Sequence, residues 1–272
     1  MLFICTILRK TTDFQLMTPS VSRPSMLWLL SEPSRALLEL GLSYSYNKLS
    51  GQAPATANGQ PVMVLPGFMS SGGSTSILRE FLANQGYDVY DWGMGRNVGK
   101  VEFVALLIER IDEIYRKTGK QISLIGWSLG GVYARQISKE RPDIIRQVIT
   151  LGSPFAGLTQ PNNVSWIYNL ISGGKKVTQI NHDFLENLPL PAPVPTTAIY
   201  SKEDGIVSWK ICMEKEEDHF HQNIQVRGSH IGLGVNQSVL SIIADRLKLS
   251  KDNWSKFKPE GFLNKTFLYP SL

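Results

Sequence analysis

Short apolar runs alternate with longer amphipathic segments from residue 61 onward. Residues 61–65 form a continuous apolar run, PVMVL, which is typical of a strand buried on both faces. Residues 101–117 instead repeat apolar side chains every three or four positions, which predicts a helix with one buried face. The two periods therefore predict strands and helices in turn.

The same reasoning predicts six strands and five helices along the chain. The expected strands are 61–65, 87–92, 121–125, 144–151, 196–201 and 223–226. The expected helices are 34–49, 75–86, 101–117, 128–141 and 236–249. This alternation indicates an α/β fold, with a mostly parallel sheet of about six strands covered by helices on both faces. In such sheets the ligand site lies beyond the carboxyl ends of the strands.

The pattern also divides the chain into parts. We expect residues 1–25 to be a poorly ordered leader, and 26–60 to hold a helix that lies on the body and a linker rich in Gly, Ala, Pro and Asn. Residues 61–250 form the core and 251–272 a C-terminal tail. The aromatic and proline-rich stretch 155–195 is long for a connection, so it predicts a small cap or lid, with a crossover helix packed on the sheet as the alternative.

The N-terminal residues do not have the order of a secretory signal. The apolar stretch 1–8 precedes Arg9 and Lys10, whereas a signal begins with its charges. The stretch is also too short to cross a bilayer. We therefore expect a cytoplasmic protein with no integral membrane span. Cys5 and Cys212 lie far apart in the sequence, so we expect neither a disulfide framework nor a cysteine-based metal site.

Composition and charge limit the classes of partner that the protein is expected to bind. The 272 residues are 42% hydrophobic and 19% charged, which is ordinary for a globular protein. The net charge of +5 comes without a dense Lys/Arg block, and no nucleic-acid-binding motif is present, so we expect no nucleic-acid partner. None of these features indicates an oligomeric state.

Candidate chemistry begins at Ser128, in the sequence Gly-Trp-Ser-Leu-Gly of residues 126–130. A serine hydroxyl is a poor nucleophile unless a base takes its proton and a turn presents it to the substrate. The predicted strand 121–125 precedes Ser128 and a predicted helix follows it. Small residues on both sides relieve the crowding of a sharp strand-to-helix turn. Ser128 is therefore a candidate nucleophile.

A base should follow a later strand. His230 comes after the strand 223–226 and a short loop, and neutral imidazole can accept the serine proton near neutral pH. The other histidines fit less well. His182 lies in the predicted cap, and His219 and His221 lie in a charged stretch where we expect exposed side chains.

The acid that orients the base should follow the strand between the two. Asp204 comes just after the strand 196–201 and before a glycine. Its rivals are the adjacent Glu203 and, in a dense charge run, Asp218. Ser128, Asp204 and His230 follow one another in the order that a nucleophile turn of this kind predicts.

An oxyanion hole needs backbone N–H groups aimed at the developing negative charge. One should come from Leu129, next to the nucleophile at a helix N-terminus. The other should come from the glycine-containing loop 66–73, with Phe68 as the donor and Met69 as the alternative. No Gly-Lys-Ser/Thr sequence follows this loop, so it does not match a phosphate-binding loop.

Several segments together resemble bacterial lipase/esterase-type α/β hydrolases, over roughly residues 61–250. The resemblance rests on residues 64–68, 126–131, 149–154, 201–207 and 228–236. It implies an α/β-hydrolase fold with Ser128 as nucleophile, Asp204 as acid, His230 as base and Phe68 in the oxyanion loop. Two features depart from the family pattern. No antiparallel strands precede Pro61, and the oxyanion loop has Pro-Gly-Phe in place of a His-Gly-Gly-Gly run.

The resulting hypothesis is a serine hydrolase that cleaves carboxylic esters through an acyl-enzyme, without metal or organic cofactor. Its substrate would be a small ester or lipid-like molecule. An acyltransferase, thioesterase or amidase could use the same triad, and a binding protein could use the same fold without catalysis. The residues expected around the substrate are Met69, Trp127, Phe155 and Trp166.

Overall fold

The computed structural model describes residues 22–49, 57–156, 186–259 and 268–272. The predicted leader lies outside the described residues up to residue 21, and so does most of the predicted cap, 157–185. Trp166 and His182 belong to the part that is not described.

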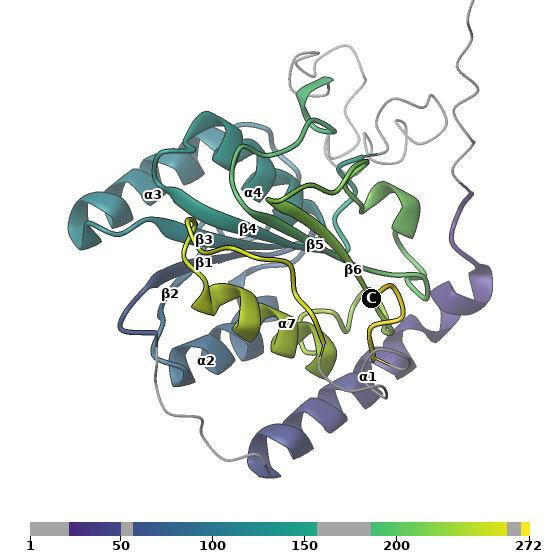
Figure 1. The fold of residues 1–272 in the computed structure, drawn as a ribbon. Helices are drawn as coiled ribbons and strands as arrows, with labels where there is room; N and C mark the ends of the chain where they lie inside the picture. Colours follow the sequence, from purple (N-terminus) through teal and green to yellow (C-terminus); the bar gives the residue numbers. More distant parts are fainter. Residues whose placement is uncertain (1–21, 50–56, 157–185, 260–267) are drawn as a thin grey trace, which may run out of the picture.

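The centre of the molecule is a six-stranded sheet in which every neighbouring pair of strands is parallel (Figure 1). The strand order is β2-β1-β3-β4-β5-β6. The strands are β1 (Pro61–Leu65), β2 (Asp88–Asp91), β3 (Ile122–Trp127), β4 (Ile145–Leu151), β5 (Thr196–Ser201) and β6 (His221–Val226). The predicted fold class is thereby confirmed. Because all strands are parallel, the loops after β1, β3, β5 and β6 leave from the same edge of the sheet.

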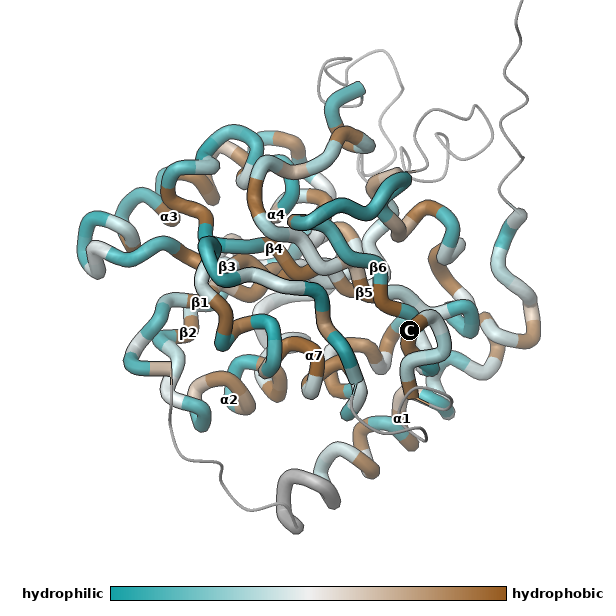
Figure 2. The backbone as a smooth tube through the Cα atoms, in the orientation of Figure 1, coloured by the Kyte–Doolittle hydropathy of each residue, from teal (hydrophilic) through white to brown (hydrophobic). Residues whose placement is uncertain are grey.

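Helices cover both faces of the sheet (Figure 1). On one face lie α3 (Phe103–Thr118) and α4 (Leu129–Glu140), and on the other lie α2 (Ser76–Asn84) and α7 (Gln237–Lys248). Each face has its own cluster of buried apolar side chains, which appear as brown segments along the strands and helices in Figure 2. The described residues also contain the two 3₁₀ turns η1 (Gly72–Thr75) and η3 (Trp209–Ile211).

Local chemistry explains where these helices stop and start. At the end of α3, Gly119 has a φ of 65°, a left-handed conformation that glycine adopts at little cost. At the start of α7, the Asn236 side chain accepts hydrogen bonds from the N–H groups of Ser238 and Val239, which satisfies two otherwise unpaired donors.

His221 differs from its prediction as an exposed side chain. It begins β6, two residues before the predicted strand, and it is buried. Its Nδ1 lies 2.7 Å from an Asp218 carboxylate oxygen and its Nε2 lies 2.9 Å from the Ala192 carbonyl oxygen. Since both ring nitrogens have partners, the ring can be buried at low cost. His219 is exposed, as predicted.

The N-terminal helix, α1 (Met26–Leu49), also differs from its prediction. It begins at Met26, whereas the predicted helix began at residue 34. Pro33 lies inside the helix, in its first turns. The leucines 37, 38 and 42 are exposed, whereas Glu32 and Ser43 are buried. The helix does lie on the body, as expected, but polar side chains make the closest attachments. None of the helices in the described part is long and apolar enough to cross a membrane.

The two neighbouring leucines of α3 test this packing. Leu107 is fully buried and Leu106 is exposed. We expect Leu107→Ala to lower the free energy of unfolding by about 2–5 kcal/mol, because it leaves a cavity. The matched change Leu106→Ala should stay within about 0.5 kcal/mol of the parent. Urea unfolding followed by circular dichroism measures both, and equal losses would contradict the assigned burial.

Candidate active site

Ser128 occupies a strained turn between β3 and α4. Its φ is 54° and its ψ is −121°, a region that costs a residue with a side chain on the order of 1–3 kcal/mol. The Ser128 N–H donates to the Leu151 carbonyl at 2.8 Å, which ties the turn to the end of β4. Helix α4 starts at the next residue, so the positive end of its dipole lies beside Ser128.

The glycines on both sides of Ser128 permit this turn sterically. A Cβ atom on Gly126 would lie 2.3 Å from the backbone of Gly131, and one on Gly130 would lie 2.3 Å from the Leu65 carbonyl oxygen. Neither space can hold a methyl group. The small residues in the motif therefore let α4 approach β1 and β3 closely.

His230 and Asp204 meet at the same edge of the sheet. Asp204 follows β5 and His230 follows β6, and His230 Nδ1 lies 2.6 Å from Asp204 Oδ2. The other carboxylate oxygen of Asp204 accepts the N–H groups of Ile206 at 2.8 Å and Val207 at 2.6 Å. The carboxylate is buried and held from both sides. Of the two rivals, Asp218 instead contacts His221, and Glu203 lies 3.9 Å from Arg227.

Two opposing effects set the pKa of His230. Burial of the ring lowers it, while the charge and hydrogen bond of Asp204 and the charge of Glu32 raise it. The net result is a pKa above the ordinary histidine value of 6.5. The two carboxylates thus favour the imidazolium form that a general base must reach.

The His230 loop and the Ser128 turn are joined by Trp127. The Trp127 indole N–H donates to the His230 carbonyl at 3.0 Å. The loop after β1 also lies close to the serine, because a Cβ on Gly67 would be 3.2 Å from Ser128 Cβ. The structure therefore brings the ends of β1, β3, β5 and β6 around Ser128.

Hydrogen bonds in the loop after β1 distinguish Phe68 from Met69, the two candidates for the second oxyanion donor. The Met69 N–H donates to the Asn97 carbonyl at 2.7 Å, so it is already engaged. Asn97 also donates from its side chain to the Pro66 carbonyl at 2.9 Å and from its backbone to the Ser70 carbonyl at 2.8 Å. This geometry favours Phe68 over Met69 as the donor and assigns the shape of the loop to Asn97.

The residues predicted around the substrate have different surroundings. Met69 is exposed and Trp127 is half-buried beside Ser128. Phe155 is fully buried, and the Arg135 guanidinium lies 3.8 Å over its ring, so protein covers one face of the ring. Trp166 lies outside the described residues.

Three residues near the site were given no role of their own by the sequence patterns: Asn97, Glu32 and Gly152, although Gly152 lies in the segment 149–154 that carries part of the resemblance. A Cβ on Gly152 would lie 3.1 Å from His230 Nδ1 and 3.2 Å from Asp204 Oδ2, so the pair packs directly on this glycine. A sequence signal was present, since Gly152 directly follows the predicted strand 144–151; in the structure it follows β4 with a φ of 55°. Glu32 accepts the His230 N–H at 3.0 Å from a helix distant in the sequence.

Other reactive groups do not form a second centre in the described ranges. Cys212 is buried, and burial, together with the charge of Asp204, raises the pKa of its thiol well above the ordinary value. Within the part of the chain that the structure describes, no three His, Cys, Asp or Glu side chains cluster as metal ligands would.

Comparison with known proteins supports the fold independently. Residues 81–190 match the model of the PGAP1-like alpha/beta domain. Aspergillus fumigatus lipase B superposes with a TM-score of 0.56 at 20% identity, over 72% of this chain and 54% of that lipase. The chain therefore spans only about half the length of that lipase.

Two further structures are similar over most of their own length. A structure from the study of the metagenome-derived lipolytic enzymes LipS and LipT matches at 13% identity and a TM-score of 0.55, over 72% of this chain and 96% of that one. The mature lipase BlEst2 of Bacillus licheniformis matches at 18% identity and a TM-score of 0.52, over 72% of this chain and 94% of that one. No curated protein sequence matches the chain.

The similar structures come from Aspergillus as well as Bacillus, so the bacterial origin implied by the sequence resemblance stays a prediction. At these identities the superpositions speak for the fold. With its six parallel strands, its PGAP1-like segment and its likeness to lipase structures, the chain has the α/β-hydrolase fold.

Proposed function

We propose that this chain is a serine hydrolase that cleaves carboxylic esters through Ser128, His230 and Asp204. The observation that carries the proposal is the 2.6 Å contact between His230 Nδ1 and Asp204 Oδ2, at the sheet edge where β3 presents Ser128. A base held at Nδ1 by a carboxylate keeps its other nitrogen, Nε2, for the serine proton. The lipase structures of similar fold are in keeping with this reaction class.

The chemistry follows from these positions. Ser128 Oγ attacks the ester carbonyl while His230 Nε2 takes its proton. The N–H groups of Leu129 and Phe68 donate to the oxyanion, which forms at the N-terminus of α4. Collapse of the tetrahedral intermediate breaks the ester bond, and His230 protonates the departing alcohol. Water then attacks the acyl-enzyme by the same steps, with His230 again as base. Asp204 stabilises the imidazolium at each stage.

The surroundings of Ser128 suit an apolar acyl group. Trp127 and Met69 flank the serine turn and the oxyanion loop, and both present apolar surface. A panel of p-nitrophenyl esters of increasing acyl length, run with and without alcohol acceptors, tests the substrate class. Release of free acid supports hydrolysis, whereas transfer to the alcohol would replace it with an acyltransferase reaction.

Removal of the nucleophile is the first test. We expect Ser128→Ala to abolish labelling by a fluorophosphonate probe and to lower kcat on p-nitrophenyl esters by about 10⁴–10⁶-fold. Ser241→Ala is the matched control, because Ser241 lies exposed on α7. Labelling and turnover that persist in Ser128→Ala would disprove the mechanism, and a parent protein that never labels would point to a binding protein.

The pKa of His230 predicts the pH dependence. Because the base must be neutral, kcat/KM should rise with pH through one ionisation, with an apparent pKa above 6.5. Asp204→Asn removes the largest raising contribution, so the apparent pKa should fall while the activity drops by about 10⁴-fold. Initial rates from pH 4 to 10 measure both. An apparent pKa below 6.5 in the parent would contradict the assigned surroundings of His230.

Asn97 provides a test of the oxyanion loop. Asn97→Ala removes the donor to the Pro66 carbonyl, so we expect Phe68 to lose its position and kcat to fall about 10- to 100-fold with little change in KM. Asn84→Ala, at the exposed end of α2, is the control. If Asn97→Ala remains folded with unchanged kcat, the loop does not depend on this side chain.

A further inference from the structure

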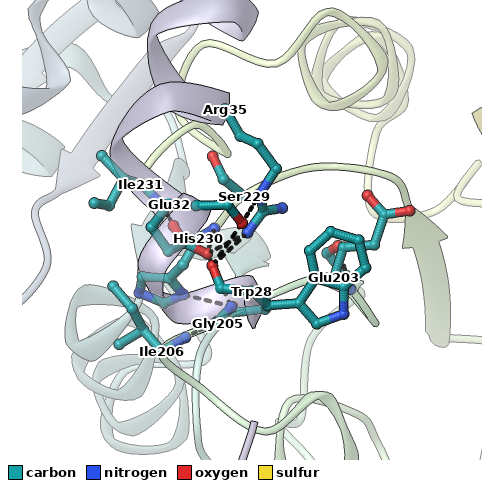
Figure 3. Close-up of polar contacts among 12 residues, drawn as sticks. Trp28, Glu32, Arg35, Glu203, Gly205, Ile206, Ser229, His230 and Ile231 are labelled. Atoms are coloured by element: carbon teal, nitrogen blue, oxygen red, sulfur yellow. Dashed lines mark hydrogen bonds and ion pairs between the residues drawn. The ribbon is translucent and has the colours of Figure 1, made fainter. Parts of the chain in front are cut away.

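Helix α1 attaches to the active-site loops through its acidic side chains (Figure 3). Glu32 points from the helix toward the backbone of the two loops that carry Asp204 and His230. Its Oε1 accepts the N–H of Gly205 at 2.8 Å and of His230 at 3.0 Å, and its Oε2 accepts the N–H of Ile231 at 3.0 Å. One carboxylate thus bridges the loop after β5 and the loop after β6.

The Glu32 carboxylate is buried, so its stability depends on these hydrogen bonds. Glu32 is 1% exposed, and besides the three backbone donors it contacts Arg35 Nη2 at 3.0 Å. A buried ion persists only where donors replace its water, so the carboxylate and the three N–H groups depend on one another. If either loop moved away, a buried charge would lose a partner.

The loop after β5 is shaped to receive the helix. A Cβ on Gly205 would lie 2.4 Å from the backbone of Trp28 and Leu29, so no larger residue could bring the acid loop this close to α1. A second carboxylate, Glu39, lies about two turns further along α1. It accepts the Ser229 N–H at 2.7 Å and the Asn236 side-chain amide at 3.0 Å, and it contacts only the His230 side of the site.

We propose that Glu32 is a positioning residue for the triad, which holds the Asp204 loop and the His230 loop at the spacing their side-chain contact needs and adds a second negative charge beside the imidazolium. The inference rests on the proposed function. The matching family model covers 81–190, so α1 lies outside the matched segment, as Asp204 and His230 do.

The charged groups around His230 make the effect measurable. Asp204 contacts the ring from the loop after β5, whereas Glu32 accepts the His230 backbone N–H from α1 and acts on the ring through its charge. Arg35, also from α1, pairs with Glu32, and Glu39 contacts the backbone of the neighbouring Ser229. Burial and Asp204 act on the pKa of His230 more strongly than Glu32 does. Changing Glu32 should therefore shift the pH range over which kcat/KM rises on the acidic side of the profile, here called the acid limb. It should not abolish the activity.

The test compares Glu32→Gln with two changes on the same helix, in the full chain. Glu32→Gln loses the charge and turns an amide N–H₂ toward a backbone donor. We expect kcat to fall about tenfold with KM little changed, and the acid limb of kcat/KM to move down by about half a pH unit. Arg35→Gln removes the opposite charge, so it should move the limb upward. Glu39→Gln should leave the limb in place.

These outcomes separate positioning from simple docking of α1. If the variants only loosened the docking of α1, Glu32→Gln and Glu39→Gln would be affected alike. The acid limb would then not move in opposite directions in Glu32→Gln and Arg35→Gln. Thermal melting checks that each variant is folded, and Glu109→Gln, exposed on α3, serves as a surface control. The proposal is overturned if folded Glu32→Gln keeps the parent kcat and acid limb, or if Glu39→Gln shifts the limb equally. If Glu32→Gln does not fold, the upward shift in Arg35→Gln decides, and its absence overturns the proposal.

Failure of the positioning role proposed for Glu32 and failure of the proposed function give different results. Fluorophosphonate labelling of the unmodified chain tests the nucleophile, whatever Glu32 does. If the parent protein is labelled and Glu32→Gln has the kinetics of the parent, only the positioning role of Glu32 is rejected. If the parent neither labels nor turns over esters, the serine mechanism itself is rejected.

Discussion

The contact between His230 and Asp204 is the interaction on which the rest of the site depends. Neither residue lies in a regular element, so the 2.6 Å distance has to be set by what surrounds the two loops. Pairing of β5 with β6 brings the strand ends together, Gly152 leaves space beneath the pair, and two backbone N–H groups orient the carboxylate. A shift of about 1 Å in one loop can cost a reaction about 100-fold, so each of these supports has a catalytic consequence.

Helix α1 shows how polar contacts can dock an element whose leucines face outward. Apolar burial is non-directional and tolerates sliding, whereas a carboxylate that accepts three N–H groups fixes both distance and angle. Glu32 and Glu39 therefore place α1 more exactly than leucine packing would. The close approach at Gly205 has the same effect, because the backbone of α1 contacts the acid loop with no side chain between them.

Much of the fold could be predicted from the sequence, and so could the placement of the candidate residues at the ends of the strands, whereas the contacts that hold their loops could not. The apolar runs indicated a parallel sheet because both faces of each strand are buried, and the ends of parallel strands then located Ser128, Asp204 and His230. Asn97 and Glu32 could not be assigned a role from the sequence, because most of their partners are backbone groups, which every residue type carries. His221 was predicted as exposed since the charge run around it hid the two acceptors, Asp218 and the Ala192 carbonyl, that allow its burial.

Because the pKa of His230 is raised, its contribution to folding stability falls over the same pH range in which the neutral ring forms. A group that binds its proton more tightly in the folded state stabilises the fold below its unfolded pKa, and that contribution is lost as pH rises through the folded pKa. For His230 the window begins near 6.5 and extends upward to the raised value. The proposed reaction needs the neutral ring, so we expect activity to appear over the same window in which the stabilisation disappears. Asp204 and Glu32 stabilise the imidazolium in the resting protein as well as in the transition state. Their benefit to catalysis therefore requires a pH at which the proton has already left the free protein.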